Sequence, residues 1–299
     1  MMRIALVTDE VSADLETALE LAARWEIDAI ELRGVGEGRY PRVSPFLRES
    51  TPRLLAESEA KVIGLSPGLF KISVPQPFRP LHFMQLLEVG RHRHEVGARA
   101  QLEDHLENLL PECIEAAQEL GCELITCFGF EPGDALEADI LGVDVEEVPD
   151  AVVEVLREAA RVAAKAGITL SLENETICWG AMGEQAAAIA RAVGEPNFGI
   201  TWDPANALLA GDTPFPTGYT EVAQFVRHVH FKDAVVDPVS RRRHFVLDGD
   251  VDWAGQIEAL HVDGYEGYVS VETHLRPKLS STEQRVAELR ALLSSGSLR

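Results

Sequence analysis

The stretch ITLSLEN, residues 168–174, decides the fold, because a short β-forming run ends there on a carboxylate, Glu173. The same pattern, an apolar run that contains or precedes a potential metal ligand, recurs three times further along the chain. These repeats are FGITWD (198–203), VRHVHF (226–231) and YVSVE (268–272), and they supply Asp203, His230 and Glu272. Successive ligands lie 30, 27 and 42 residues apart (173 to 203, 203 to 230, 230 to 272), close to one strand–helix unit each. We therefore predict four consecutive parallel strands that carry these ligands at their C-terminal ends.

The rest of the chain continues this alternation of short β-rich runs and longer segments with apolar residues at helical spacing. The expected strands are 3–8, 29–33, 61–65, 124–128, 168–172, 198–202, 228–231 and 267–271. The expected helices include 13–25, 45–59, 101–120, 150–166, 184–193 and 282–293, and Gly121, Gly167 and Gly194 mark helix ends. Strands that alternate with helices pair in parallel, and ligands on four successive strands converge only if the sheet curves round. We predict one α/β domain over residues 1–299, a (β/α)8 TIM barrel whose chemistry lies at the C-terminal strand ends.

Two insertions interrupt the alternation, at about 66–97 and 235–250. The first contains Pro67, Pro75, Pro77 and Pro80, and a short helix is expected within it at 81–90. Long loops in compact domains are usually functional or disordered. Both insertions follow strands, so we expect them beside the active face.

Charge and composition exclude several classes of function. The net charge of −22 disfavours nucleic acid and anionic membranes as partners, because both are bound through concentrated Lys and Arg. No apolar stretch is long enough for a signal peptide or a membrane span. The four cysteines show no paired spacing that would indicate a zinc knuckle or a disulfide framework. We expect a cytoplasmic protein with no nucleic-acid or membrane partner.

The ligand set would present three carboxylates and one neutral imidazole to a single ion. Hard oxygen ligands suit Mg²⁺ and Mn²⁺, and the imidazole also admits Co²⁺. We expect one divalent ion, Mn²⁺ first, with Co²⁺, Mg²⁺ or Zn²⁺ as the other candidates. Such an ion could polarise the carbonyl of a hydroxy-ketone and stabilise the enediolate formed by deprotonation. Glu173 and Glu272, on different strands, could then act as base and acid.

Each ligand also has a purely structural interpretation. An acidic residue just past a strand often caps the next helix, as expected for Asp203 before Pro204. His228 and His230 share one face of a strand and could be core groups. The coincidence of four suitable ligands at matching strand ends favours the metal site.

Several motifs together resemble a known family. They are LEN (172–174), ITWDPAN (200–206), HVHFKD (228–233), LDGDVDW (247–253) and VE (271–272). In these segments the chain resembles the sugar phosphate isomerase/epimerase family of xylose isomerase-like barrels, whose relatives include ketose 3-epimerases, hydroxypyruvate isomerase, inosose dehydratase and endonuclease IV. The resemblance spans essentially the whole chain, although its specific motifs lie within 168–275.

By this resemblance, Glu173, Asp203, His230 and Glu272 take the metal positions, and the two glutamates take the acid and base roles. It places Glu31 near the pocket, and it implies a sugar or polyol ketone as substrate and a homodimer or homotetramer as assembly. The sequence departs from many relatives at Asn206, where they carry a histidine, so a second metal is not expected.

Other residues have two interpretations each. Lys232 could stabilise an enolate as a catalytic group, or form an ion pair with Asp233 or a metal-binding glutamate. Arg241, in the run RRRH (241–244), could bind a phosphate or carboxylate, or lie in a solvated loop. Trp179 could stack on a sugar or serve packing. The predicted substrate-binding set is Glu31, Trp179, Asn206, His228 and Arg241.

The leading functional prediction is a metal-dependent isomerase or epimerase of a sugar or related polyol ketone. A lyase similar to inosose dehydratase is the first alternative, because dehydration begins with the same deprotonation. A non-catalytic sugar-binding barrel and an endonuclease IV-like phosphodiesterase are further alternatives.

Overall fold

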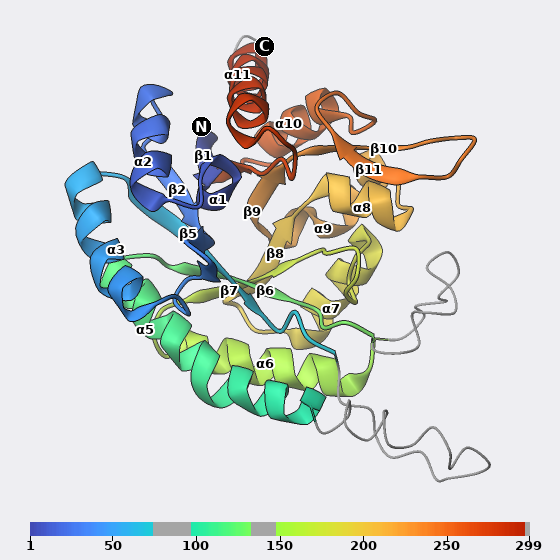
Figure 1. Cartoon of the computed structure of the whole chain (residues 1–299). Coiled ribbons are helices and arrows are strands. Elements are labelled where there is room, and N and C mark those ends of the chain that lie inside the picture. Colours follow the sequence, from blue (N-terminus) through green and yellow to red (C-terminus); the bar gives the residue numbers. More distant parts are fainter. Residues whose placement is uncertain (74–96, 133–147, 297–299) are drawn as a thin grey trace.

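Eight parallel strands close into a barrel in a computed structural model of the chain, which describes residues 1–73, 97–132 and 148–296 (Figure 1). Their order round the barrel is β1-β12-β9-β8-β7-β6-β5-β2. The strands are β1 (Arg3–Val7), β2 (Ala29–Leu32), β5 (Lys61–Leu69), β6 (Leu124–Phe128), β7 (Thr169–Glu173), β8 (Phe198–Trp202), β9 (Val226–Phe231) and β12 (Tyr268–Val271). The predicted (β/α)8 barrel is confirmed, and each expected strand is present.

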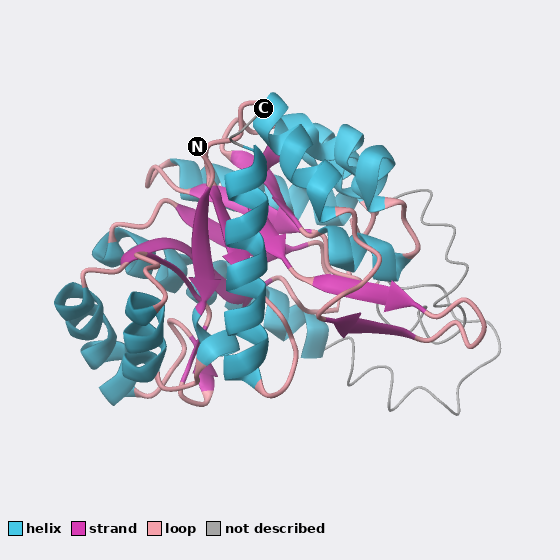
Figure 2. Cartoon of the chain, turned by 90° about the horizontal axis from the view of Figure 1, so that it is seen from above, coloured by secondary structure: helices cyan, strands magenta, loops and turns pink. Residues whose placement is uncertain are grey.

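Helices surround the strands on the outside, as the view from above shows (Figure 2). The longer ones are α2 (Leu15–Arg24), α3 (Pro45–Ser58), α5 (Leu110–Leu120), α6 (Asp150–Ala164), α7 (Gly183–Val193), α10 (Trp253–Val262) and α11 (Lys278–Gly296). Helix α6 shows why they pack there: Val152, Leu156, Ala159 and Ala163 are buried and recur at helical spacing on one face. Two of the expected helix ends are seen in Gly121 and Gly194, which end α5 and α7 at φ values of 65° and 67°.

The expected helix at 101–120 is more complex than predicted. Residues 97–104 are helical, but a π-turn, η1 (His105–Leu109), separates them from α5. The backbone N–H of Phe70 donates to Nδ1 of His105 at 2.9 Å. Single π-turns are frequent at functional sites. Here the turn places His105 where its ring accepts a hydrogen bond from the end of β5.

The insertions differ in how much of them is described. The first begins later than predicted, because β5 continues to Leu69, and the short helix expected at 81–90 lies outside the described residues. The second forms a hairpin of β10 (Asp233–Val236) and β11 (Arg243–Val246) that projects away from the barrel (Figure 1). A smaller hairpin of β3 (Gly34–Val35) and β4 (Gly38–Arg39) follows β2.

The hairpin β10–β11 is fixed at both of its ends by one carboxylate. Oxygens of Asp233 accept the backbone N–H groups of Ala234 at 2.8 Å, Gly249 at 3.0 Å and Val251 at 3.1 Å. A Cβ at position 249 would lie 2.4 Å from the carbonyl oxygen of Ala234, so the close approach requires glycine. The hairpin is thus anchored at its base.

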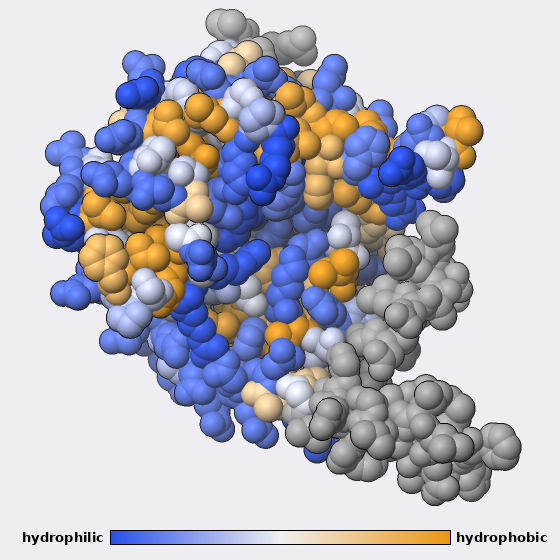
Figure 3. All heavy atoms as spheres, in the orientation of Figure 1, coloured by the Kyte–Doolittle hydropathy of each residue, from blue (hydrophilic) through white to orange (hydrophobic). Residues whose placement is uncertain are grey.

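Hydrophilic side chains (blue) reach into the middle of the molecule between apolar ones (orange) in the space-filling view (Figure 3). Among the described helices, none combines the length and apolar character that crossing a bilayer requires.

Candidate metal centre

The four predicted ligands meet at one end of the barrel. Each offers one atom, and these atoms all lie within 4.8 Å of one another. Glu173 ends β7, Asp203 directly follows β8, His230 lies in β9, and Glu272 directly follows β12. All four side chains are buried. The barrel therefore assembles the ligand set that the strand spacing predicts.

The two oxygens of Asp203 have different partners. Its Oδ1 accepts the backbone N–H of Asn206 at 2.8 Å and so caps α8 (Pro204–Ala210). Its Oδ2 is buried, lies 2.8 Å from the ammonium of Lys232 and faces the other candidate ligands. Asn174 fixes the backbone at this point, because its side-chain oxygen accepts the N–H of Asp203 at 2.7 Å and its amide donates to the carbonyl at 2.8 Å.

His230 supplies a buried atom without a hydrogen-bond partner. Its Nδ1 makes no hydrogen bond within the described part of the chain. It lies 3.3 Å from Oε1 of Glu173, 3.3 Å from Oε2 of Glu272 and 3.9 Å from Oδ2 of Asp203. A buried polar atom left unsatisfied costs free energy. A ring nitrogen that faces three carboxylate oxygens in this way fits a divalent cation.

Lys232 partly neutralises the site. Its Nζ lies 2.6 Å from Oε2 of Glu272 and 2.8 Å from Oδ2 of Asp203, and the side chain is 1% exposed. Burial alone would lower the pKa of Lys232, but these carboxylates raise it far above its ordinary value, so the ammonium stays charged. Three ligand carboxylates and this ammonium leave two negative charges, which a divalent ion would balance. Of the two interpretations of Lys232, the ion pair is present, and its partner is Glu272, one of the predicted ligands.

The segment LDGDVDW (247–253) contacts the backbone of Lys232. The indole Nε1 of Trp253 donates to the backbone carbonyl of Lys232 at 2.9 Å. Asp252 caps α10 by accepting the N–H of Gly255 at 2.9 Å. The motif thus holds the lysine backbone against the barrel.

Arg33 is a site residue that the sequence analysis missed. It is buried and ion-paired to Glu272 Oε1, to Glu10 Oε1 and, at 2.7 Å, to Asp9 Oδ1. Burial would raise the pKa of Glu272, but Lys232, neighbouring imidazoles and Arg33 hold it well below its usual range. Arg33 lies two residues after Glu31, so strand alternation was the available signal.

His274 adds a third basic neighbour to Glu272. Its Nε2 lies 3.3 Å from Oε1 of Glu272, and its Nδ1 lies 3.2 Å from Oε1 of Glu10. The residue has a φ of 55°, in the left-handed region, and it is partly exposed. Both oxygens of Glu272 are therefore engaged by basic side chains.

Metal binding is expected to weaken as the pH falls below about 6. Burial raises the pKa of Asp203 to about 6 despite the nearby Lys232, so below that pH a proton increasingly occupies the carboxylate. Burial disfavours a charged His230, but Glu31, Glu173 and Glu272 together raise its pKa well above the usual range. A metal must displace these protons, and each one displaced weakens the apparent affinity about tenfold per pH unit.

Calorimetric titration with Mn²⁺ at about pH 5.5 and about pH 7.5, in buffers of different ionisation enthalpy, measures both effects. We expect tighter binding at the higher pH, and proton release at both pH values, with more protons released at the lower one because Asp203 is then protonated too. An affinity that does not change with pH, without proton release, would contradict the assignment of Asp203 and His230 as ligands.

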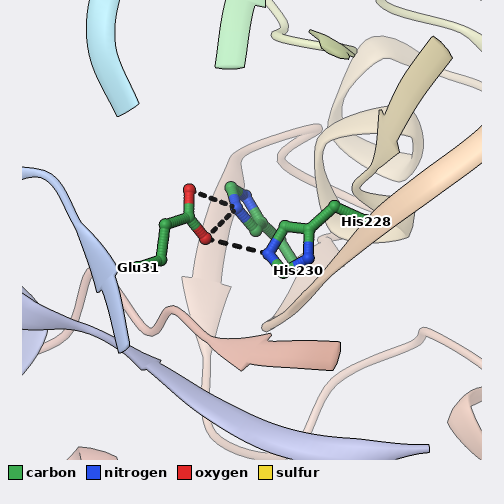
Figure 4. A group of neighbouring side chains, drawn as sticks. All are labelled: Glu31, His228 and His230. Carbon is green, nitrogen blue, oxygen red and sulfur yellow. Dashed lines mark hydrogen bonds and ion pairs between the residues drawn. The ribbon is translucent and has the colours of Figure 1, made fainter. Parts of the chain in front are cut away.

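The predicted substrate-binding residues lie in different environments. Glu31 and His228 are inside the barrel next to His230 (Figure 4). Asn206 is buried, and its amide donates to Oε1 of Glu173 at 3.4 Å. Trp179 is 9% exposed, and its backbone N–H donates to the carbonyl of Phe130. Arg241 lies exposed in the turn of the β10–β11 hairpin, which carries it away from the ligand set.

Comparisons with known proteins agree with this architecture. A family model described as xylose isomerase-like TIM barrel matches residues 19–295. No curated protein sequence matches the chain. Similar solved structures, each with a TM-score of 0.68, include an L-ribulose 3-epimerase (17% identity; 99% of this chain, 96% of that chain) and "IOLI protein with a binding zinc atom" (18% identity; 98% and 99%). A probable 3-DHS dehydratase, AsbF from Bacillus anthracis, is 14% identical over 97% of this chain and 99% of its own. The chain belongs to the xylose isomerase-like TIM barrel family.

Proposed function

We propose that this barrel is a divalent-metal-dependent isomerase or epimerase of a sugar or related polyol ketone, acting by proton transfer through an enediolate. The observation that carries the proposal is the buried Nδ1 of His230, which makes no hydrogen bond within the described residues and faces the carboxylates of Glu173, Asp203 and Glu272. A bound divalent ion would supply polarisation of the substrate carbonyl. Mn²⁺ is the ion we propose first, because carboxylates dominate the ligand set.

The two glutamates are placed to handle protons on different sides of a substrate. Glu173 lies at the end of β7 and Glu272 follows β12, with β8 and β9 between these strands in the barrel. One carboxylate would take the proton from the carbon beside the carbonyl and become a carboxylic acid. Delivery of a proton to the former carbonyl carbon, together with passage of the substrate hydroxyl proton to the former carbonyl oxygen, gives isomerisation. Delivery by the other glutamate to the opposite face of the carbon that lost the proton gives epimerisation.

Lys232 and Asn206 would assist these transfers. The ammonium of Lys232 lies beside Glu272, where it can stabilise negative charge that develops on a substrate oxygen. The amide of Asn206 is near Oε1 of Glu173 and can orient that carboxylate. Both groups are held in place before any substrate arrives.

A lyase is the second candidate. The similarity to a probable dehydratase gives it support, and the same enediolate could expel a β-hydroxyl group as water. The product distinguishes the two reactions, since dehydration creates an unsaturated or dicarbonyl compound that absorbs in the ultraviolet.

The test combines metal analysis with solvent-deuterium incorporation into L-ribulose, D-tagatose, D-fructose and a keto-inositol, with and without Mn²⁺. Metal-dependent exchange would support the proposal and show which class of ketone the site accepts. Metal binding without exchange would favour a non-catalytic binding barrel, and an ultraviolet-absorbing product would favour the lyase. A chain that binds no divalent metal would contradict the proposal.

A further inference from the structure

One carboxylate and two imidazoles are buried together in the barrel interior next to the ligand set (Figure 4). Glu31 comes from β2, and His228 and His230 come from β9. Strands β1 and β12 separate β2 from β9 in the barrel, so the side chain of Glu31 contacts residues of a strand that is not its neighbour. The three side chains are 0%, 2% and 1% exposed. Water does not reach them from the surface, and their polar atoms depend on one another.

Irregular strand pairing accompanies both halves of this group. The register between β2 and β5 shifts between Ile30 and Glu31. The register between β8 and β9 shifts as well, so that Ile200 pairs with Val226 but Thr201 pairs with His228. Bulges of this kind redirect side chains and are common beside active sites. The two register shifts indicate that the backbone of β2 and β9 is adjusted locally to direct these side chains into the barrel.

The hydrogen bonds fix where the protons lie. Oε2 of Glu31 contacts Nε2 of His228 at 2.9 Å and Nε2 of His230 at 3.0 Å. Nε2 of His230 also lies 3.2 Å from Oε1. An ionised carboxylate can only accept, so both Nε2 atoms must donate. A neutral His230 then carries its single proton on Nε2, and its Nδ1 presents a lone pair.

We propose that Glu31 is a positioning residue for the metal centre, which holds His230 in the Nε2–H tautomer with Nδ1 turned toward the three ligand carboxylates. His228 is the second donor that keeps Glu31 in place, and its Nε2 also lies 2.9 Å from the hydroxyl of Ser270. This inference rests on the metal dependence proposed above. Partners of this kind orient the ring of a metal-bound histidine and raise its basicity.

A second metal held by Glu31, His228 and His230 themselves fits the geometry less well. The Nε2 atoms that face the carboxylate are already satisfied by it, whereas Nδ1 of His230 is the atom without a partner. If a metal were bound to Nε2 of a neutral His230, the proton would have to lie on Nδ1. The Nδ1 atom could then no longer act as a ligand in the four-residue set. One metal per chain, bound through Nδ1, is therefore expected.

The test is a Co²⁺ titration of the metal-free, full-length protein, followed by calorimetry and by the visible spectrum. The wild type is titrated first, so that absence of Co²⁺ binding would overturn the metal-dependent function itself as well as the role of Glu31. Given wild-type binding of one Co²⁺, Glu31→Gln is expected to weaken it about 10- to 100-fold and to change the spectrum. Asp233→Asn is the matched control, because it neutralises a buried carboxylate whose hydrogen bonds go to backbone amides, and its Co²⁺ affinity should equal that of the wild type.

Two further results decide the matter even if Glu31→Gln does not fold. Nitrogen-15 NMR of histidine in the Zn²⁺-loaded wild type should show His230 bound through Nδ1 and protonated on Nε2, and His228→Asn, which removes the second donor to Glu31, should bind Co²⁺ more weakly than the wild type does. Metal bound to Nε2 of His230 would overturn the inference, as would two Co²⁺ per wild-type chain. A folded Glu31→Gln protein with wild-type affinity and spectrum would overturn the role of Glu31 alone.

Discussion

Replacing Glu272 with glutamine is expected to lower the rate of solvent-deuterium exchange by about 100-fold or more, the range typical for loss of a general acid or base. The amide keeps an oxygen that can reach a metal but cannot take up a proton from carbon. Exchange into an accepted ketose, measured together with bound metal, separates these two roles. Glu173→Gln should cause a loss of similar size, because proton transfer on the other side of the substrate would stop.

The exposed Glu266, which pairs with the N-terminal amine at 2.9 Å, provides the control. Glu266→Gln should exchange deuterium at the wild-type rate. If Glu272→Gln retained full turnover with metal bound, Glu272 could not be an acid or base in the reaction.

Replacing Lys232 with methionine is expected to destabilise the metal-free protein by about 3–5 kcal/mol, because it leaves buried carboxylates without their cation. The ammonium lies within 2.8 Å of oxygens of both Asp203 and Glu272, and it is 1% exposed. A divalent metal should restore much of this loss, since it would balance the same carboxylates and binds the native state only. Thermal unfolding with a chelator and then with saturating Mn²⁺ measures both values.

We expect the rise in melting temperature on adding Mn²⁺ to be larger for Lys232→Met than for the wild type. Lys165 is exposed, and Lys165→Met should show the same rise in melting temperature on adding Mn²⁺ as the wild type. An equal rise in Lys232→Met and the wild type would show that the lysine and the metal do not share these carboxylates.

The ligand set could be predicted from sequence because it depends on two regular features. Parallel strands end at one side of the barrel, and each strand–helix unit has a similar length, so Glu173, Asp203 and Glu272 were expected to converge. The fold followed from the same alternation. The structural interpretation of Asp203 is confirmed by one oxygen, which caps α8, while the other oxygen faces Lys232 and the remaining candidate ligands.

Contacts across the barrel could not be predicted in the same way. Arg33 meets Glu272, and Glu31 meets His228, through pairings between strands that lie far apart in the sequence. The register shifts that direct these side chains inward depend on neighbouring strands rather than on local composition. The path of the β10–β11 hairpin likewise follows from its own antiparallel pairing, and it leaves Arg241 in the exposed turn between the two strands.

The anchoring of that hairpin by Asp233 has a practical consequence for protein engineering. Because one carboxylate fastens both ends of the hairpin to the barrel, and Phe245 of β11 packs over the ammonium of Lys232 near this base, we expect changes confined to the turn at residues 238–241 to leave Lys232 in place. A fluorophore or a grafted peptide at this turn would extend from the hairpin as an appendage. The barrel could then serve as a scaffold that displays the added group without disturbing the candidate metal centre.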